Sequence, residues 1–252
     1  MKSWAEIGFE IETTADGSPT LRLLESVDPT KYRGESMHHS GGAWAETLLI
    51  YGKGAAHVLA VQDSPHFFVL GLGMGYIELA IAREALLAKK EIGLITSYEA
   101  VPELRSYFWN WLYNHSENLD ADVWQTYEWM AKSVISGTDL SVDELKMKLR
   151  PLFATESVIN SELTSNFVLS TQYHGIMYDA FSSKTNPLLW EEEFLTRFLS
   201  VAAAPISIFS TYACRVSLKS ALRATGFEAL VQRGFQGKRN STLGLKGVEK
   251  RS

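Results

Sequence analysis

The sequence predicts an α/β fold built around a mostly parallel sheet of the doubly wound kind. Residues 66–70 form a short apolar run that ends directly in three glycines at alternate positions, Gly71, Gly73 and Gly75. The next stretch, residues 76–89, is rich in alanine, leucine and isoleucine, which is typical of a helix. Strand, glycine-rich turn and helix, in this order, are the opening unit of a doubly wound sheet.

The composition excludes several classes of protein. The chain has 252 residues, of which 46% are apolar and 21% charged, values ordinary for a soluble globular protein. No apolar run reaches the roughly 18 residues that a transmembrane helix needs, and the N-terminus lacks the apolar core of a signal peptide. The single cysteine, Cys214, excludes an internal disulfide and a cysteine-rich zinc site. We therefore expect a cytoplasmic protein with no membrane span and no bound metal.

The charge of the chain is unevenly distributed. The net charge is −5, but residues 233–252 contain six lysines and arginines against one acid, a local charge of +5 that leaves −10 for the rest. A basic segment on an acidic body could contact phosphate groups, or it could simply be a solubilising tail. The sequence leaves both interpretations open.

Hydrophobic periodicity and turn residues predict the remaining elements. Before the first parallel strand we expect a hairpin over residues 6–25 and a helix from Ala43. The later predicted elements are strands at 91–98, 175–178 and 205–209, helices at 187–202 and 214–225, and a terminal antiparallel pair at 227–231 and 241–245.

An aromatic-rich insertion follows the second parallel strand. Residues 104–150 hold four of the seven tryptophans and are expected to form two or three helices, the last opened by a capping box of Ser141 and Glu144. Such aromatics could stack on bases, but we expect them to form the core of a small helical cap. The prediction is one decorated domain over 1–252, with the hairpin and first helix in residues 1–62.

The glycine-rich turn and a later acid indicate a cofactor site. Glycines at the end of a strand let the backbone approach a ligand closely. A dinucleotide fingerprint would need a small residue where Tyr76 stands. Glu99 ends the next strand and can accept both hydroxyls of a ribose, unless it is merely a solvated acid. This pattern is closer to S-adenosylmethionine binding, and the residues expected to hold that cofactor are Gly71, Leu72, Gly73, Gly75 and Glu99.

A second acid is placed to take part in chemistry. Asp179 directly follows the strand expected on the other side of the switch point, where the order of the strands reverses. A carboxylate there would lie near the sulfonium of the cofactor and the incoming nucleophile. The alternative is an aspartate that only caps a turn.

Three stretches of the sequence together resemble the MnmC-type methyltransferase family. They are residues 35–47, which contain Glu-Ser-Met-His, residues 178–190, which contain Asp-Ala-Phe and end in tryptophan, and residues 234–239, which end in Lys-Arg. The resemblance covers about residues 34–245, and the segment from Asp179 to Trp190 is its most specific part. It implies a Rossmann-like fold of the class I S-adenosylmethionine-dependent methyltransferases.

Members of that family methylate the aminomethyl group on C5 of the wobble uridine in certain tRNAs. The usual turn is Gly-Phe-Gly-Thr-Gly, whereas this chain has Leu72 and Met74 between its glycines, and residues 153–157 show no Gly-Asp pair for adenine. Some members carry a fused FAD-dependent oxidase that exposes the amine, for which 252 residues leave no room. The chain therefore resembles the stand-alone methyltransferase half, served by a separate oxidase.

The resemblance implies roles for particular residues. Asp179 would orient the amine and accept its proton, with Tyr178 and Phe181 as walls, while alignment of the reacting atoms supplies most of the rate. His38 would bridge to Glu35, which we place near the cofactor, or line the substrate entrance, or only bond to backbone. The residues expected to contact tRNA phosphates are Lys184, Arg233, Lys238 and Arg239.

Other functions remain open from the sequence. One alternative is a methyltransferase for another, small amine, and another is an aminopropyltransferase of the polyamine type, which shares the fold but needs several acids around its diamine. A third is a non-catalytic module that keeps the fold, which Met74 and the missing Gly-Asp pair would favour.

Overall fold

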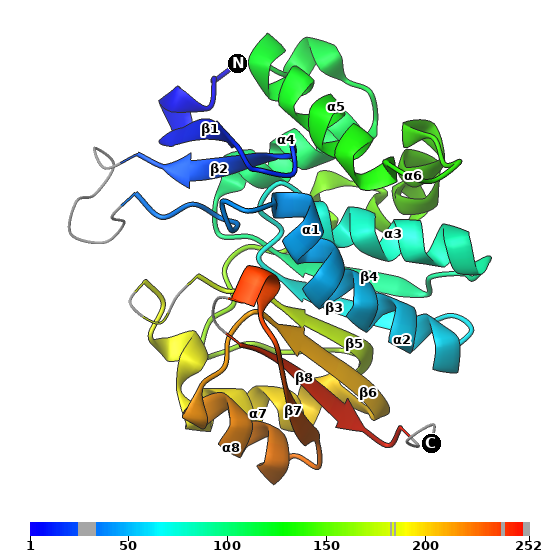
Figure 1. Ribbon diagram of the computed structural model, residues 1–252, viewed down its shortest axis with the longest axis vertical. Coiled ribbons are helices and arrows are strands. Elements are labelled where there is room, and N and C mark those ends of the chain that lie inside the picture. The colour runs from blue at the N-terminus through cyan, green and yellow to red at the C-terminus, as the bar shows by residue number, and fades with distance from the viewer. Residues whose placement is uncertain (25–33, 182, 184, 238–239, 249–252) are drawn as a thin grey trace.

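A six-stranded sheet with the order β4-β3-β5-β6-β8-β7 forms the centre of the molecule (Figure 1). The computed structural model describes residues 1–24, 34–181, 183, 185–237 and 240–248. β4, β3, β5 and β6 run parallel, whereas β8 is antiparallel to both of its neighbours, so the predicted mostly parallel sheet is confirmed. The strands are β3 His66–Leu70, β4 Leu94–Tyr98, β5 Tyr173–Tyr178, β6 Ala203–Thr211, β7 Glu228–Gln232 and β8 Ser241–Lys246.

Helices cover both faces of this sheet, which explains why its central strands are continuous apolar runs. In β3, Phe67 and Val69 belong to one buried core, and Phe68 and Leu70 belong to the other. The first face carries α1 Ala43–Thr47, α2 Lys53–Val61 and α3 Tyr76–Ala88, and the second carries α7 Glu192–Ala202 and α8 Val216–Ala224 (Figure 1).

The aromatic insertion folds into three helices between β4 and β5, and these are α4 Pro102–Leu112, α5 Ala121–Ile135 and α6 Val142–Leu149. Trp111 and Tyr127 are fully buried and stack with ring centroids 5.5 Å apart. The capping box of Ser141 and Glu144 is present at the start of α6. The expectation that these aromatics form a helical core is therefore confirmed for the largest buried rings.

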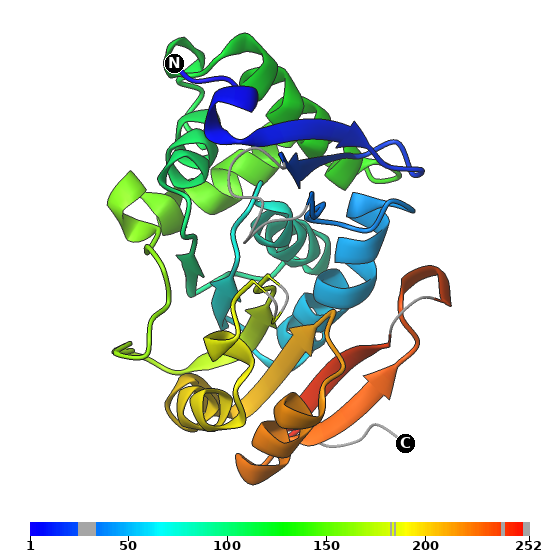
Figure 2. The same ribbon diagram turned by 90° about the vertical axis from the view of Figure 1, so that its left-hand side faces the viewer.

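The N-terminal hairpin lies against this helical cap (Figure 2). β1 Phe9–Thr13 and β2 Pro19–Leu23 pair in antiparallel fashion as a separate two-stranded sheet. The indole nitrogen of Trp4 donates a hydrogen bond to Thr126 of α5. Residues 35–39, which we call the strap, then run beside β2, where Ser36 forms an isolated antiparallel β-bridge with Arg22.

Two predicted helices differ from the structure. The helix expected over 187–202 is divided, because the extended backbone of Glu191 separates a 3-10 turn at Leu188–Trp190 from α7. The helix from Ala43 contains a π-helical turn, Leu48–Gly52, between α1 and α2. Among the described residues no helix has both the length and the apolar character needed to cross a membrane.

Candidate active site

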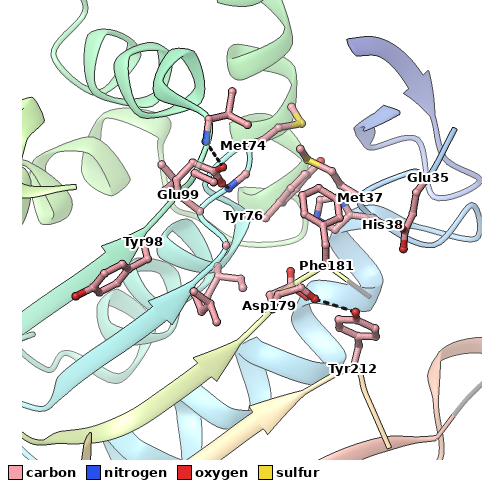
Figure 3. Close-up of a pocket in the computed structure, with 18 of the residues that line it drawn as sticks. Glu35, Met37, His38, Met74, Tyr76, Tyr98, Glu99, Asp179, Phe181 and Tyr212 are labelled. Atoms are coloured by element: carbon pink, nitrogen blue, oxygen red, sulfur yellow. Dashed lines mark hydrogen bonds between the residues drawn. The ribbon is translucent and has the colours of Figure 1, made fainter. Parts of the chain in front are cut away.

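A cavity of about 650 Å³ opens where β3, β4 and β5 reach their carboxyl ends. This is the position at which open α/β sheets bind their ligands, and the size is usual for a small-molecule site. The cavity is lined by the glycine-rich turn, by the residues that follow β4 and β5, by the strap and by the π-helical turn (Figure 3).

The three glycines of the turn have different functions. All three have positive φ, at 87° for Gly71, 53° for Gly73 and 93° for Gly75, a region that favours glycine. A Cβ on Gly71 would lie 2.5 Å from the carbonyl oxygen of Asp179, and one on Gly75 would lie 2.4 Å from the ring of Phe108. Gly75 is therefore a packing position and does not line the cavity, whereas Gly71, Leu72 and Gly73 do.

Glu99 organises the turn from the end of β4 (Figure 3). One carboxylate oxygen accepts a hydrogen bond of 2.8 Å from the backbone N–H of Gly73, and the other accepts one of 2.9 Å from Val101. The side chain is only 7% exposed, and this burial raises the pKa of its carboxyl group while the backbone hydrogen bonds oppose the rise. Because a carboxylate has about four lone-pair sites, each oxygen keeps one for a ligand.

Asp179 lies on the opposite side of the glycine-rich turn. Its backbone N–H donates to Leu70 of β3, and its Oδ1 accepts a hydrogen bond of 2.6 Å from the hydroxyl of Tyr51. Burial, aided by the charge of Glu46, raises the pKa of Asp179 to about 7, although the Tyr51 hydrogen bond lowers it. A carboxyl group with that pKa can take up and release a proton near neutral pH.

The strap places His38 in the cavity wall, but not in a bridge to Glu35. The Nδ1 atom of His38 shares a hydrogen bond of 2.8 Å with Thr20, and burial lowers the pKa of the ring to about 4. His38 is therefore neutral at physiological pH. Glu35 also lines the cavity and accepts a bond of 3.4 Å from Thr185 in the loop after β5.

Phe181 lines the cavity as expected, but Tyr178 does not. Side chains alternate between the two faces along a strand, so Tyr178 points away from the side that Asp179 faces. It is fully buried in the second core, where its hydroxyl donates to Leu189, and the expectation that it walls the substrate site does not fit this position. Trp190 anchors the segment by donating a hydrogen bond of 2.8 Å to the carbonyl of Phe181.

The basic residues can be placed only in part. Arg233 is exposed and lies beside Lys53 at a second, shallower hollow between the π-helical turn and the end of β7. Lys184, Lys238 and Arg239 lie outside the described residues.

Several residues at the site carry no sequence motif that marks them as site residues. Tyr51 and Glu46 are ordinary positions of an amphipathic helix, and Tyr212 follows β6 in a stretch with no recognisable motif. Lys53, which lines the second hollow and not the cavity, is likewise only one basic residue at the start of a helix. Only the tertiary fold brings these side chains to the site.

The sheet, the glycine-rich turn and the acids that follow β4 and β5 define a Rossmann-like methyltransferase. Residues 119–247 match a family described as S-adenosyl-L-methionine-dependent methyltransferases, and the chain belongs to that family. The fold is similar to the crystal structure of MNMC2 from Aquifex aeolicus, with a TM-score of 0.60, 20% identity, and coverage of 96% of this chain and 70% of that one. CalS10, an amino pentose methyltransferase from Micromonospora echinaspora, is a more distant likeness, with a TM-score of 0.44, 10% identity, and coverage of 82% and 92%. The predicted fold class and cofactor are confirmed.

The residues present fit S-adenosylmethionine. Gly73 leaves a place that a side chain would fill, because a Cβ there would lie 3.4 Å from the sulfur of Met37. Glu99 keeps lone pairs suited to the two hydroxyls of a ribose. The negative charge around the cavity suits a positive sulfonium.

Replacing Gly73 with valine should abolish cofactor binding, because the side chain would occupy the cradle between the turn and Met37. Gly17→Val is the matched control, since Gly17 also has a positive φ but a Cβ there meets nothing within 4 Å. Both variants carry backbone strain, yet only Gly73→Val should lose binding in a calorimetric titration. Unchanged affinity in a folded Gly73→Val protein would place the cofactor elsewhere.

Proposed function

We propose that the protein transfers a methyl group from S-adenosylmethionine to the nitrogen of an aminomethyl group on C5 of the wobble uridine in tRNA. The observation that carries this proposal is the charge of the cavity. Its described lining residues include five acids and neither lysine nor arginine; the acids are Glu35, Glu46, Glu99, Glu162 and Asp179. Such a lining favours an amine acceptor beside a sulfonium and disfavours a phosphate.

The acceptor nitrogen must be neutral when it attacks. Bound S-adenosylmethionine supplies a methyl group activated by its positive sulfur. Asp179 has the pKa and the position to accept the proton that the nitrogen loses as it gains the methyl group. Phe181 and Met37 are apolar neighbours that exclude water from the approach and help hold the reacting atoms in line.

The remainder of a tRNA would stay outside the acidic cavity. Its phosphates need a basic surface, and the hollow beside Lys53 and Arg233 supplies one on the described surface. The family resemblance adds Lys184, Lys238 and Arg239 to the proposed contacts. A separate FAD-dependent oxidase would expose the amine before methylation.

Labelled methyl transfer tests the proposal directly. The substrate is tRNA isolated from a strain that lacks this protein, and nucleoside analysis then locates the label. We expect label in a wobble uridine derivative and none in tRNA from the parent strain, which is already modified. Absence of label from tRNA, with an active cofactor site, would contradict the proposal.

The number of acids also supports a second acceptor class, a small polyamine. Three of the cavity acids, Asp179, Glu35 and Glu99, were expected at the site from the sequence, and the fold adds Glu46 and Glu162. The same assay with putrescine and spermidine separates the two classes, because only this alternative predicts label in the small amine.

Removing Lys53 and Arg233 together should weaken tRNA binding and flatten its salt dependence. For each phosphate that the protein no longer neutralises, the slope of log affinity against log salt falls by about 0.7 to 0.9. The affinity for S-adenosylmethionine should not change. Lys132 and Arg223 are exposed at other places on the molecule, so their double alanine variant is the control. An unchanged slope in the Lys53→Ala, Arg233→Ala protein would remove this surface from the tRNA interface.

A further inference from the structure

Tyr51 is carried by an unusual piece of backbone. It lies in the π-helical turn Leu48–Gly52 that interrupts the helix between α1 and α2. Single π-turns within α-helices are rare and occur frequently at functional sites. The turn is held close to the sheet, because a Cβ on Gly54, one residue into α2, would lie 2.2 Å from the hydroxyl oxygen of Ser210 in β6.

This backbone delivers the Tyr51 hydroxyl to the carboxylate that follows β5. Tyr51 is 3% exposed and lines the cavity. Its O–H donates a hydrogen bond of 2.6 Å to Oδ1 of Asp179. Oδ2 of Asp179 has no hydrogen-bond partner among the residues that the structure describes, and Asp179 itself lines the cavity.

We propose that Tyr51 is the positioning residue for Asp179, fixing Oδ1 so that Oδ2 is left to face the acceptor. The inference rests on the proposed function only for the identity of the acceptor. Tyr51 does not touch the reacting atoms in this scheme and acts through Asp179. The function of the π-helical turn is to bring a hydrogen-bond donor to the end of β5.

The direction of the electrical effect follows from the groups that face Asp179. Two acids, Glu46 in α1 and the buried Glu78 in α3, disfavour the ionised form of Asp179. Tyr212, which follows β6, contributes a phenol group to the same surroundings. Burial raises the pKa of Tyr51 well above its usual value, so this side chain stays a donor. Without the donor, the carboxylate loses stabilisation and the pKa of Asp179 must rise.

The first test follows Asp179 in the ligand-free protein. Carbon NMR of protein labelled at aspartate carboxyl groups, with Asp179→Asn to assign the signal, should show a midpoint near pH 7. In Tyr51→Phe the midpoint should rise by about one to two units, the scale of a hydrogen bond to a charged group. The control is Tyr113→Phe, which loses a hydroxyl bond to Arg150 outside the cavity and should leave the midpoint unchanged.

A second variant keeps the test informative if Tyr51→Phe does not fold correctly. Ring fluorination at Tyr51 preserves the shape of the side chain but makes its hydroxyl a stronger donor, so the midpoint should fall instead of rising. Opposite shifts in the two variants support the inference. A midpoint that neither variant moves overturns it, whatever the acceptor proves to be.

Kinetics provides a readout that a merely structural residue would not change. At pH 7 the methyl-transfer rate of Tyr51→Phe should fall about 5- to 50-fold, as the ionised fraction of Asp179 falls from about one half. Much of the rate should return above pH 9, where Asp179 ionises again. A loss that is equal at every pH would contradict this role, while failure to methylate tRNA at all would count only against the proposed function.

Discussion

Replacing Asp179 with asparagine should lower the rate of methyl transfer by about 100-fold or more while leaving the affinity for S-adenosylmethionine nearly unchanged. The amide has almost the same shape as the carboxyl group, but it cannot accept the proton of the acceptor amine. Single-turnover measurements separate the transfer step from binding, and calorimetry gives the affinity. Wild-type single-turnover rates in Asp179→Asn would exclude the proposed role.

The direction in which the rate changes with pH follows from the protonation of Asp179. Burial raises the pKa of Asp179 to about 7, so the protein should gain activity as the pH rises through that value and the carboxylate forms. Burial lowers the pKa of His38 to about 4, so this ring should not contribute to the step. In Asp179→Asn, the residual rate of methyl transfer should no longer rise near pH 7 through ionisation of residue 179. Any pH dependence that remains should come from ionisation of the acceptor itself.

The second large effect is expected at Glu99. Removing its carboxylate in Glu99→Ala should weaken binding of S-adenosylmethionine by at least about 100-fold. Two hydrogen bonds to a charged group contribute roughly 3 to 6 kcal/mol together. The N–H groups of Gly73 and Val101 would also lose their acceptor, which loosens the turn around the cofactor.

A matched control keeps this measurement specific. Glu103 is an acid four residues later that pairs with Lys2 and does not line the cavity, so Glu103→Ala should bind the cofactor normally. Isothermal titration compares the two variants at one pH and salt concentration. Binding by Glu99→Ala within threefold of the wild type would assign the ribose to other residues.

The central strand of the site and the two acids beside it could be predicted from local sequence. The run of residues 66–70 coincides with β3, because an apolar strand buried on both faces has a strong and unmistakable pattern. Since the carboxyl ends of parallel strands meet at one edge, Glu99 and Asp179 could be placed around the same cavity without a structure. Both line it.

The differences between the expected and the observed positions come from geometry that local sequence does not encode. Tyr178 precedes Asp179, and the alternation of a strand sends the two side chains to opposite faces. Tyr51 fits an amphipathic helix, but a π-helical turn alters the register of that helix. Gly75 resembles a cofactor glycine in the sequence. A side chain is excluded there by the ring of Phe108, more than thirty positions along the chain, and not by the cofactor.

The place of β8 in the sheet has a consequence for biosynthesis. Residues 241–246 insert between β6 and β7, and the turn before them carries Phe235 and Gln236 back to His39 and Gly41 of the cavity region. A nascent chain that has emerged only as far as β7 has an open edge on β6, and β7 has no neighbour. Exposed edges of this kind invite association with other chains. The sheet can therefore close only after residues 241–246 have left the ribosome, and the cavity region that the preceding turn contacts is completed at that step rather than earlier.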